Sequence, residues 1–485
     1  MNNLPEEIIC HIINYLENTI DVINFSMSNK FYRNLILQNK QIFNCISKFN
    51  NKYINEIDKL NIIGKLKVNL SNSDVKDVSK LVNCEELNLS DCENLIDVSM
   101  LGNIKKLNLS HCDNITDVSK LVNCEELNLS DCNNITDVSN LGNIKKLNLS
   151  NCDSITDVSK LVNCEELNLS DCYNITDVSN LGNIKKLNLS HCDSITDVSK
   201  LVNCEELDLS DCYNITDVSN LGNVKILNLS DCKNIKDVRM LGNVKYLNLS
   251  YCENITDVSM LGNVEELNLR FCENITDVSN LGNVKKLDLS GCHLIKDFSM
   301  LGNCEELVLF NCKNIDVSNF GNIKKLDLAH CKNISDISKL INCEELDLCG
   351  CVNISDVSML GNCKKLDLTG CYKITDVSML GNCEELNLSY CYNITDVSML
   401  GKIKKINLSH CNIKDVSMLG NCEELDLSHC LDIKDVSMLG NVKKLNLSYC
   451  NKISDVSMLG NVKKLNLSYC NNIKDISMLG NVKKL

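Results

Sequence analysis

The sequence predicts an α/β solenoid, a stack of short parallel strands joined by short turns, preceded by a small α-helical head. From Leu81 onward a unit of 20 residues recurs along the chain, and self-similarity at a fixed period is the signature of stacked repeats. Each unit contains the motif Leu-Asn-Leu or a close variant, as at residues 87–89, which places two leucines on one face of a strand and a polar residue on the other. Residues 1–45 lack this period and show the apolar spacing of helices.

These observations divide the chain into a helical head over residues 1–45, a linker or helical cap over 46–60, and about 21–22 repeats over 61–485. One short strand cannot bury its apolar face alone, whereas stacked strands share one long core. The Asp-Val-Ser segment that follows each strand suits a short convex turn, and we expect Asp97 to cap that turn through a side-chain oxygen. Gly102 and Asn103 suit the tight return to the next strand.

The outward charge at the start of each strand alternates in sign, as at Glu86, Lys106 and Glu126. Opposite charges on neighbouring strands favour this stacking over a slip by one repeat, although each exposed pair contributes only about 0.2–1 kcal/mol. Recent duplication of a 40-residue unit would produce the same pattern, and both explanations can hold. The alternation fails at Lys444, Lys464 and Lys484.

The chain has 32 cysteines, of which twenty recur once per repeat in a column that begins at Cys92. Cys84 and Cys92 would lie some 26 Å apart on an extended strand, too far to share a zinc ion. Cysteines on neighbouring strands would lie about 4.8 Å apart with parallel side chains, which does not suit a disulfide. We expect them instead to be buried small hydrophobes whose S–H groups donate to backbone carbonyls, so no metal site or cofactor is predicted.

No catalytic residue is predicted, because each His-Cys pair is part of a repeat and each glycine is a single turn residue rather than part of a phosphate loop. The formal charge of −15 argues against nucleic acid as a partner. No apolar run reaches transmembrane length, and Glu6 and Glu7 stand where a secretion signal needs positive charge. The sequence therefore favours a non-catalytic cytoplasmic protein with no membrane partner.

The motif Leu-x-x-Leu-x-Leu-x-x-Cys-x-x-Ile resembles the leucine-rich repeat in its cysteine-containing variant, over about residues 61–485. The resemblance implies a horseshoe or superhelix with a parallel β-sheet on the concave face and short turns or 3-10 segments on the convex face. Because the sequence contains no motif for chemistry, binding is the function that remains, and we expect a partner site on the concave face.

The outward places on the strands are nearly uniform along the chain, so departures from the repeat are informative. They cluster on the repeats between about residues 226 and 310, where aromatic, aliphatic and arginine side chains replace the usual Glu, Lys, Asn or Ser. Tyr, Arg and Phe are typical interface anchors. We hypothesise that these departures form a partner-binding site, made of Ile226, Tyr246, Arg270, Phe271, Val308 and Phe310. The alternative is that the repeat is old and its residues have drifted, which would produce the same pattern. A second, looser aromatic group is Tyr372, Tyr390 and Tyr392.

The head resembles an F-box, through LPEEIICHIINYL at residues 4–16 and the apolar pattern that follows over residues 21–35. The late tryptophan of that motif is missing, and Phe43 is its nearest substitute. The resemblance implies binding to the Skp-type adaptor of a cullin ubiquitin ligase through Leu4, Pro5, Ile8, Ile12, Leu16, Val22 and Phe25. The alternative is an ordinary helical cap that shields the first repeat.

An F-box followed by leucine-rich repeats resembles the substrate-recognition subunits of SCF-type ubiquitin ligases. The repeats would then hold an unidentified protein substrate, and the chain itself would catalyse nothing. The composition also resembles the F-box and repeat proteins encoded by large DNA viruses of amoebae, which would place the chain in the host cytoplasm. Two alternatives stay open: an interaction scaffold whose head only caps the repeats, and a decoy that occupies the adaptor without presenting a substrate.

Overall fold

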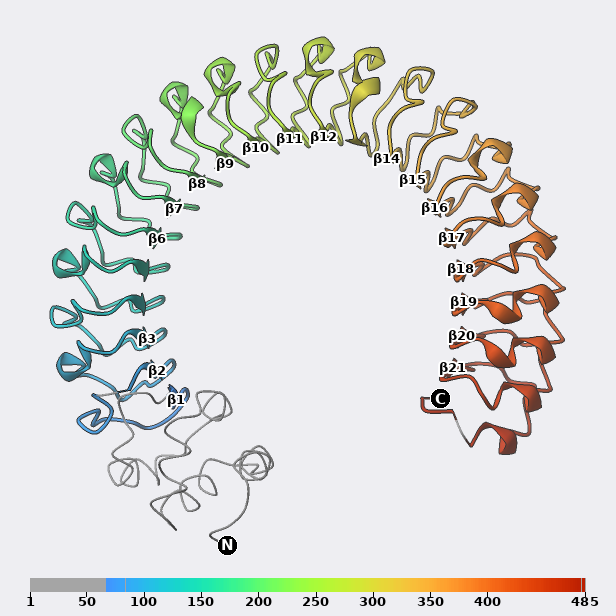
Figure 1. Ribbon diagram of the computed structural model, residues 1–485, viewed down its shortest axis with the longest axis horizontal. Coiled ribbons are helices and arrows are strands. Elements are labelled where there is room, and N and C mark those ends of the chain that lie inside the picture. Colours follow the sequence, from blue (N-terminus) through green and yellow to red (C-terminus); the bar gives the residue numbers. More distant parts are fainter. Residues whose placement is uncertain (1–66, 83, 481, 485) are drawn as a thin grey trace, which may run out of the picture. The chain divides into compact units, whose positions relative to one another are not determined.

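A computed structural model describes residues 67–82, 84–480 and 482–484. The predicted helical head, the linker, and all seven residues expected to bind the adaptor lie outside the described residues, so these assignments stay predictions. The chain divides into two compact units, residues 1–235 and 236–485. In both units the strands line one edge and the turns line the other, so the predicted stack of strands and turns is confirmed (Figure 1).

The first unit holds nine three-residue strands among its described residues, with a 3-10 helix in four of its repeats. The strands are β1 (Lys67–Asn69), β2 (Glu86–Asn88), β3 (Lys106–Asn108), β4 (Glu126–Asn128), β5 (Lys146–Asn148), β6 (Glu166–Asn168), β7 (Lys186–Asn188), β8 (Glu206–Asp208) and β9 (Ile226–Asn228). The 3-10 helices are η5 (Ser99–Leu101), η6 (Ser139–Leu141), η7 (Ser179–Leu181) and η8 (Ser219–Asn223).

The second unit holds twelve such strands in its described part, with a 3-10 helix in most of its repeats. The strands are β10 (Tyr246–Asn248), β11 (Glu266–Asn268), β12 (Lys286–Asp288), β13 (Glu306–Val308), β14 (Lys325–Asp327), β15 (Glu345–Asp347), β16 (Lys365–Asp367), β17 (Glu385–Asn387), β18 (Lys405–Asn407), β19 (Glu424–Asp426), β20 (Lys444–Asn446) and β21 (Lys464–Asn466). The 3-10 helices are η9 (Arg239–Leu241), η10 (Ser279–Leu281), η11 (Ser299–Asn303), η12 (Ser358–Leu360), η13 (Ser378–Leu380), η14 (Ser398–Leu400), η15 (Ser417–Asn421), η16 (Ser437–Asn441), η17 (Ser457–Leu459) and η18 (Ser477–Leu479).

Within each unit, successive strands pair in parallel, so equivalent residues of successive repeats lie side by side. In the first unit Leu87 of β2 aligns with Leu107 of β3, and in the second unit Leu267 of β11 aligns with Leu287 of β12. A last parallel bridge pairs Lys464 with Lys484, at the strand site that follows β21. Every position of the repeat therefore forms a column of stacked side chains that runs along the unit.

The core consists of the inward columns, as the alternation of the strand predicts. Leu87 and Leu89 are buried while Asn88 between them is half-buried. The column of Cys92 is buried too, and the Sγ of Cys112 donates to the backbone oxygen of Leu89 at 3.2 Å. Burial raises the pKa of the Cys112 thiol to about 12, so the group stays neutral. The described cysteines are free thiols, and all of them except the half-buried Cys349 are buried.

The convex turns are capped by the aspartate of Asp-Val-Ser, as predicted. The Oδ1 of Asp97 accepts a hydrogen bond from the backbone N–H of Ser99 at 2.9 Å, and the same bond recurs in later repeats. Gly102 is required for a different reason from the tight turn expected. Its backbone is right-handed, but a Cβ there would lie 2.1 Å from the backbone oxygen of Lys120, so glycine allows successive repeats to pack closely.

These capping carboxylates predict a loss of stability in acid. The hydrogen bonds from Ser99 lower the pKa of Asp97, and equivalent bonds lower the pKa of Asp137 and Asp277. A lowered pKa contributes stability above the unfolded value of about 4, which is lost as the pH falls through the folded value. We expect the thermal midpoint to hold between pH 7 and 5 and to fall below about pH 4. A midpoint that does not change down to pH 3 would contradict the capping role.

No helix among the residues that the structure describes is both long and apolar enough to cross a membrane.

Candidate partner-binding face

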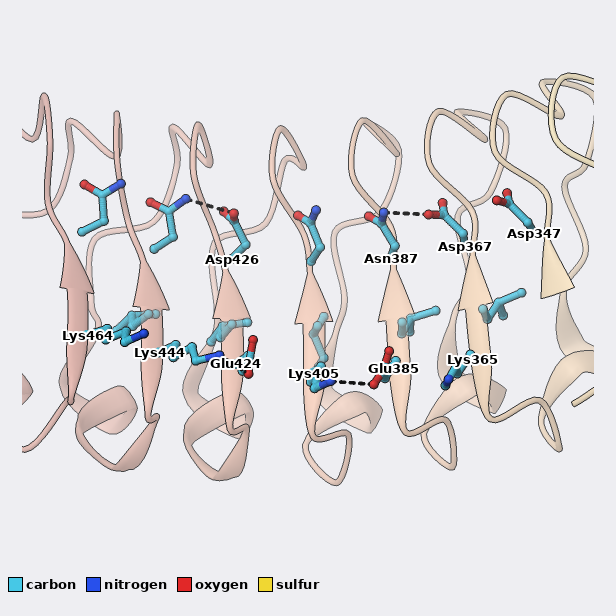
Figure 2. Close-up of a pocket in the computed structure, with 18 of the residues that line it drawn as sticks. Asp347, Lys365, Asp367, Glu385, Asn387, Lys405, Glu424, Asp426, Lys444 and Lys464 are labelled. Atoms are coloured by element: carbon cyan, nitrogen blue, oxygen red, sulfur yellow. Dashed lines mark hydrogen bonds and ion pairs between the residues drawn. The ribbon is translucent and has the colours of Figure 1, made fainter. Parts of the chain in front are cut away.

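The strands of each unit line an open groove built from the same columns of outward side chains. In the second unit this groove has a volume of about 1340 Å³ and extends along β13–β21. Figure 2 shows the part of it between Asp347 and Lys464. In the first unit a groove of about 860 Å³ extends along β1–β9. Both grooves present two polar columns, one from the first residue of each strand and one from the third.

The first column carries the alternating charges, and opposite charges do pair across strands. Lys106 lies 2.9 Å from Glu126 in the first unit, and Lys405 lies 2.7 Å from Glu385 in the second. The expected failure of the alternation is present as well, since Lys444 aligns with Lys464. Because these pairs are solvent-exposed, each adds little to stability. Whether they also favour this stacking over a slip by one repeat stays a prediction.

The second column holds Asn or Asp in nearly every repeat, and its side chains are engaged with the backbone. The Oδ1 of Asn88 accepts a hydrogen bond from the N–H of Ser90 at 2.9 Å, and Asp347 accepts the same bond from Cys349 at 2.8 Å. Amide and carboxylate serve equally well in this bond, because both offer an acceptor oxygen. Asn-to-Asp changes in this column therefore alter charge without altering the local fold.

Three consecutive strands of the second unit, β14–β16, carry Asp in this column, at Asp327, Asp347 and Asp367. All three are half-buried. Burial, followed by the charges of Asp367 and Asp327, raises the pKa of Asp347 to about 6, and burial raises that of Asp327. The groove therefore holds a row of carboxylates that a positively charged group would stabilise. We call these three residues the carboxylate row.

The structure brings three of the predicted partner-binding residues together. The guanidinium of Arg270 lies 5.0 Å from the ring centre of Phe271 and 5.8 Å from that of Phe310. Phe271 stacks on Tyr251 with a centroid distance of 5.0 Å, and Phe310 meets His330 edge-on at 5.3 Å. The charge of Arg270 is also among those that act on Asp327, the first residue of the carboxylate row, although burial keeps the pKa of Asp327 raised.

The other predicted residues lie elsewhere in the repeats. Tyr246 begins β10, where the Nζ of Lys245 lies 4.8 Å from its ring centre, and Val308 ends β13 between Asp288 and Asp327. Ile226 begins β9 in the first unit and is 41% exposed. Arg270, Phe271 and Phe310 follow the carboxyl ends of their strands rather than standing on them. Nothing in the structure tests whether these residues bind a partner.

A column that sequence reasoning missed lies directly before the ladder cysteine. Its residues have positive φ, for example 58° at Asp91 and 63° at Tyr449, a left-handed conformation that costs bulky residues roughly 1–2 kcal/mol. We call it the left-handed column. Its N–H groups continue the pairing between repeats, as from Tyr390 to the backbone oxygen of Ser409 at 2.9 Å.

In the last repeats of the second unit this column forms a continuous stack of aromatic rings. Successive ring centres are 4.2–4.5 Å apart with planes 11–15° from parallel. The rings belong to Tyr390, His410, His429, Tyr449 and Tyr469. The second aromatic group predicted from the sequence overlaps this stack, because Tyr390 belongs to both and Tyr392 contacts Tyr390 edge-on at a centroid distance of 6.2 Å. The third member of the group, Tyr372, is exposed. We call this stack the aromatic ladder.

Within the described part of the chain, no group of three or more His, Cys, Asp or Glu side chains is arranged to hold a metal ion. The His-Cys neighbours are separated by the turn, since each histidine stands in the left-handed column while the cysteine points into the core.

Comparison with known proteins identifies the repeat. The Leucine Rich repeat family model matches residues 103–119 and 183–199. No curated protein sequence matches the chain. Solved structures with a similar chain path include an internalin (inlF) from Listeria monocytogenes, with 18% identity, 82% of this chain and 93% of that chain covered, and a TM-score of 0.32.

Two further solved structures are similar to a comparable extent. The leucine-rich-repeat ectodomain of the plant membrane receptor kinase GASSHO1/SCHENGEN3 from Arabidopsis thaliana, in complex with CASPARIAN STRIP INTEGRITY FACTOR 2, is 17% identical, with 85% of this chain and 68% of that chain covered and a TM-score of 0.35. The functional domain of InlJ from Listeria monocytogenes, which includes a cysteine ladder, is 17% identical, with 81% and 74% covered and a TM-score of 0.29.

Proposed function

We propose that this chain, which carries leucine-rich repeats, is a non-catalytic protein–protein interaction protein that binds a protein partner through the strand side of its repeats. The observation that carries the proposal is the cluster of Arg270 with Phe271 and Phe310. Aromatic and arginine side chains that break an otherwise uniform polar surface are the residues that dominate interface energies. The open groove beside the cluster, along β13–β21, would supply the surrounding polar contacts.

A triple substitution that restores the repeat template tests this proposal. In Tyr246→Lys with Arg270→Ser and Phe310→Ser, each new residue is the one that most other repeats have at that position. The fold should therefore persist while the anchors are lost, and we expect capture of a protein partner by the full chain to weaken by about 100-fold or more. Partner capture is measured by affinity purification and quantitative mass spectrometry.

Tyr173→Asn is the matched control, because it removes an exposed tyrosine that follows the ladder cysteine of its own repeat and is not part of the cluster. It should leave partner capture unchanged. If the triple variant folds and still captures the same partner as well as the wild-type chain does, the assignment of the binding face is wrong.

We propose further that the chain is a cytoplasmic substrate-recognition subunit of an SCF-type ubiquitin ligase. The support is the resemblance of residues 4–16 and 21–35 to an F-box, with Pro5, the only proline of the chain, at the place where that motif has one. In this proposal the head holds the Skp-type adaptor, the repeats hold the substrate, and the ligase transfers ubiquitin. The further resemblance to proteins of large DNA viruses of amoebae would make the adaptor that of a host cell.

Two other roles compete with the ligase subunit, and each has a distinct outcome. A scaffold whose head only caps the repeats would fail to co-purify with the adaptor while keeping its partner. A decoy would co-purify with the adaptor, yet a partner captured with it would receive no ubiquitin in a reconstituted reaction. Adaptor binding together with ubiquitin transfer to the captured partner would support the ligase role.

A further inference from the structure

The left-handed column is interrupted by glycine in three repeats of the second unit, at Gly291, Gly350 and Gly370. The first two positions are covered by the ring of the preceding repeat. A Cβ on Gly291 would lie 2.4 Å from the Phe271 ring, and a Cβ on Gly350 would lie 2.7 Å from the His330 ring. A Cβ on Gly370 would meet nothing within 4 Å. The column therefore has one open notch, over Gly370.

One wall of this notch is the end of the aromatic ladder. One face of the Tyr390 ring stacks on His410, in the following repeat, with planes 11° apart and centres 4.2 Å apart. Because the rings stack along the direction in which the repeats succeed one another, the opposite face of Tyr390 is turned toward the preceding repeat, which contributes Gly370. Tyr390 is 43% exposed, so a planar group entering the notch would extend the ladder by one member.

The carboxylate row lies beside the notch. Asp347 and Asp367 belong to the same two repeats as Gly350 and Gly370. The same carboxylates, after burial, raise the pKa of the half-buried Cys349 thiol to about 11. The notch is therefore aromatic on one side and negative on another.

The chain itself shows the same kind of contact between a guanidinium and aromatic rings. Arg270 lies over the rings of Phe271 and Phe310. A guanidinium suits such a place because it is planar, permanently charged and weakly hydrated, so it can stack on a ring and face a carboxylate at once. The notch over Gly370 has the ring of Tyr390 and the carboxylates of its own and the preceding repeat, and among the described residues nothing lies within 4 Å of a Cβ built on Gly370.

We propose that the notch over Gly370 seats an arginine side chain of a protein partner, stacked on the open face of Tyr390 and facing the carboxylates of Asp347 and Asp367. The proposal rests on the proposed function, since it assumes that the repeats bind a protein. It adds a chemical requirement for that partner, namely an exposed arginine in the segment that crosses β15–β17. Lysine lacks the planar group, and an aromatic side chain lacks the charge.

Saturation-transfer NMR with the full chain and short peptides tests the notch directly. The probes are the peptide Gly-Ser-Arg-Ser-Gly and versions with lysine, citrulline or tyrosine at the central position. Citrulline keeps the planar shape of arginine without its charge. We expect the arginine peptide to bind about three- to tenfold more tightly than the lysine, citrulline and tyrosine peptides.

Two variants locate the binding. Gly370→Tyr fills the notch with a ring in a conformation that Tyr390 and Tyr449 already adopt, and it should weaken arginine binding about tenfold. Asp347→Asn removes one charge of the row but keeps the hydrogen bond from the backbone N–H of Cys349, so it should weaken binding about threefold with the fold intact. This variant decides the question if Gly370→Tyr does not fold. Asp208→Asn, the same change in the first unit, is the control and should have no effect.

Equal binding of the arginine and lysine peptides, preference for the tyrosine peptide, or binding that survives both variants would overturn the proposal. Absence of any binding by the arginine peptide would overturn it as well. None of these results would bear on the adaptor, because Gly370→Tyr leaves the head unchanged and should leave adaptor capture unchanged. Failure of the notch and failure of the proposed function are therefore distinguishable.

Discussion

Replacing Leu4 and Pro5 together by alanine is expected to abolish capture of a Skp-type adaptor by the full chain. By the resemblance to an F-box these two residues begin the adaptor-binding segment, and apolar anchors at the centre of an interface carry most of its binding energy. We expect the affinity to fall by about 100-fold or more. The measurement is co-purification of the recombinant adaptor with the full chain, followed by titration of the complex.

Asn3→Ala is the matched control, since it changes a neighbouring polar residue and leaves the apolar pattern in place. Adaptor binding that survives the double substitution in a folded chain would reject the ligase role. Absence of adaptor binding by the wild-type chain would reject it equally and would leave the interaction scaffold as the function. Capture of the partner by the repeats should be unaffected in either case.

Leu189→Ala is expected to lower the free energy of unfolding of the first unit by about 2–5 kcal/mol. Leu189 is 0% exposed and stands in the column of leucines that joins each repeat to the next. Truncation removes apolar contacts with both neighbouring repeats and leaves a cavity that their backbones, held by the parallel pairing, cannot close. Because repeats are stabilised by their neighbours, we expect the loss to spread to the adjacent repeats in a urea titration followed by hydrogen exchange.

Lys186→Ala, three residues earlier, provides the comparison. Lys186 lies 2.9 Å from Glu206 on the exposed side of the strand, so its loss should change the free energy of unfolding far less than the loss of Leu189. Equal effects of the two substitutions would mean that the inward and outward faces of the strands are wrongly assigned.

The columns that recur in every repeat could be predicted from the sequence. The leucines, the ladder cysteines and the capping aspartates each play one local role, so a single unit shows what all of them do. The Sγ of Cys112 donates to Leu89 and the side chain of Asp97 accepts from Ser99 as expected. The charge pairing of Lys106 with Glu126 followed from strand register alone.

The left-handed column could not be predicted, because its residue type changes from repeat to repeat. Asp, Asn, His, Tyr, Phe and Gly all occupy it, and this variety hid the shared backbone conformation. The enrichment in Asp, Asn and Gly was the available signal, since these residues tolerate positive φ best. In the sequence His410 and His429 are notable only as neighbours of cysteine. In the structure their rings stack on aromatic residues of the adjacent repeats, about 20 positions away.

The carboxylate row was hidden for the opposite reason. Asp and Asn are interchangeable for the backbone hydrogen bond, so Asp347 and Asp367 looked like ordinary members of their column. Their importance depends on which strands are neighbours and on how deeply the groove buries them, and both are properties of the stacked structure. The need for glycine at position 102 likewise arises from the close contact with the next repeat, rather than from the local backbone conformation that the sequence suggested.

Site-specific photo-crosslinking tests most directly whether partners bind the strand side of the repeats. A benzoylphenylalanine at position 246 would stand at the start of β10, and one at position 260 would replace Met260, an exposed residue of the convex turn. The proposed function predicts crosslinks between position 246 and a captured protein partner, and none from position 260. Crosslinks from position 260 alone would contradict it.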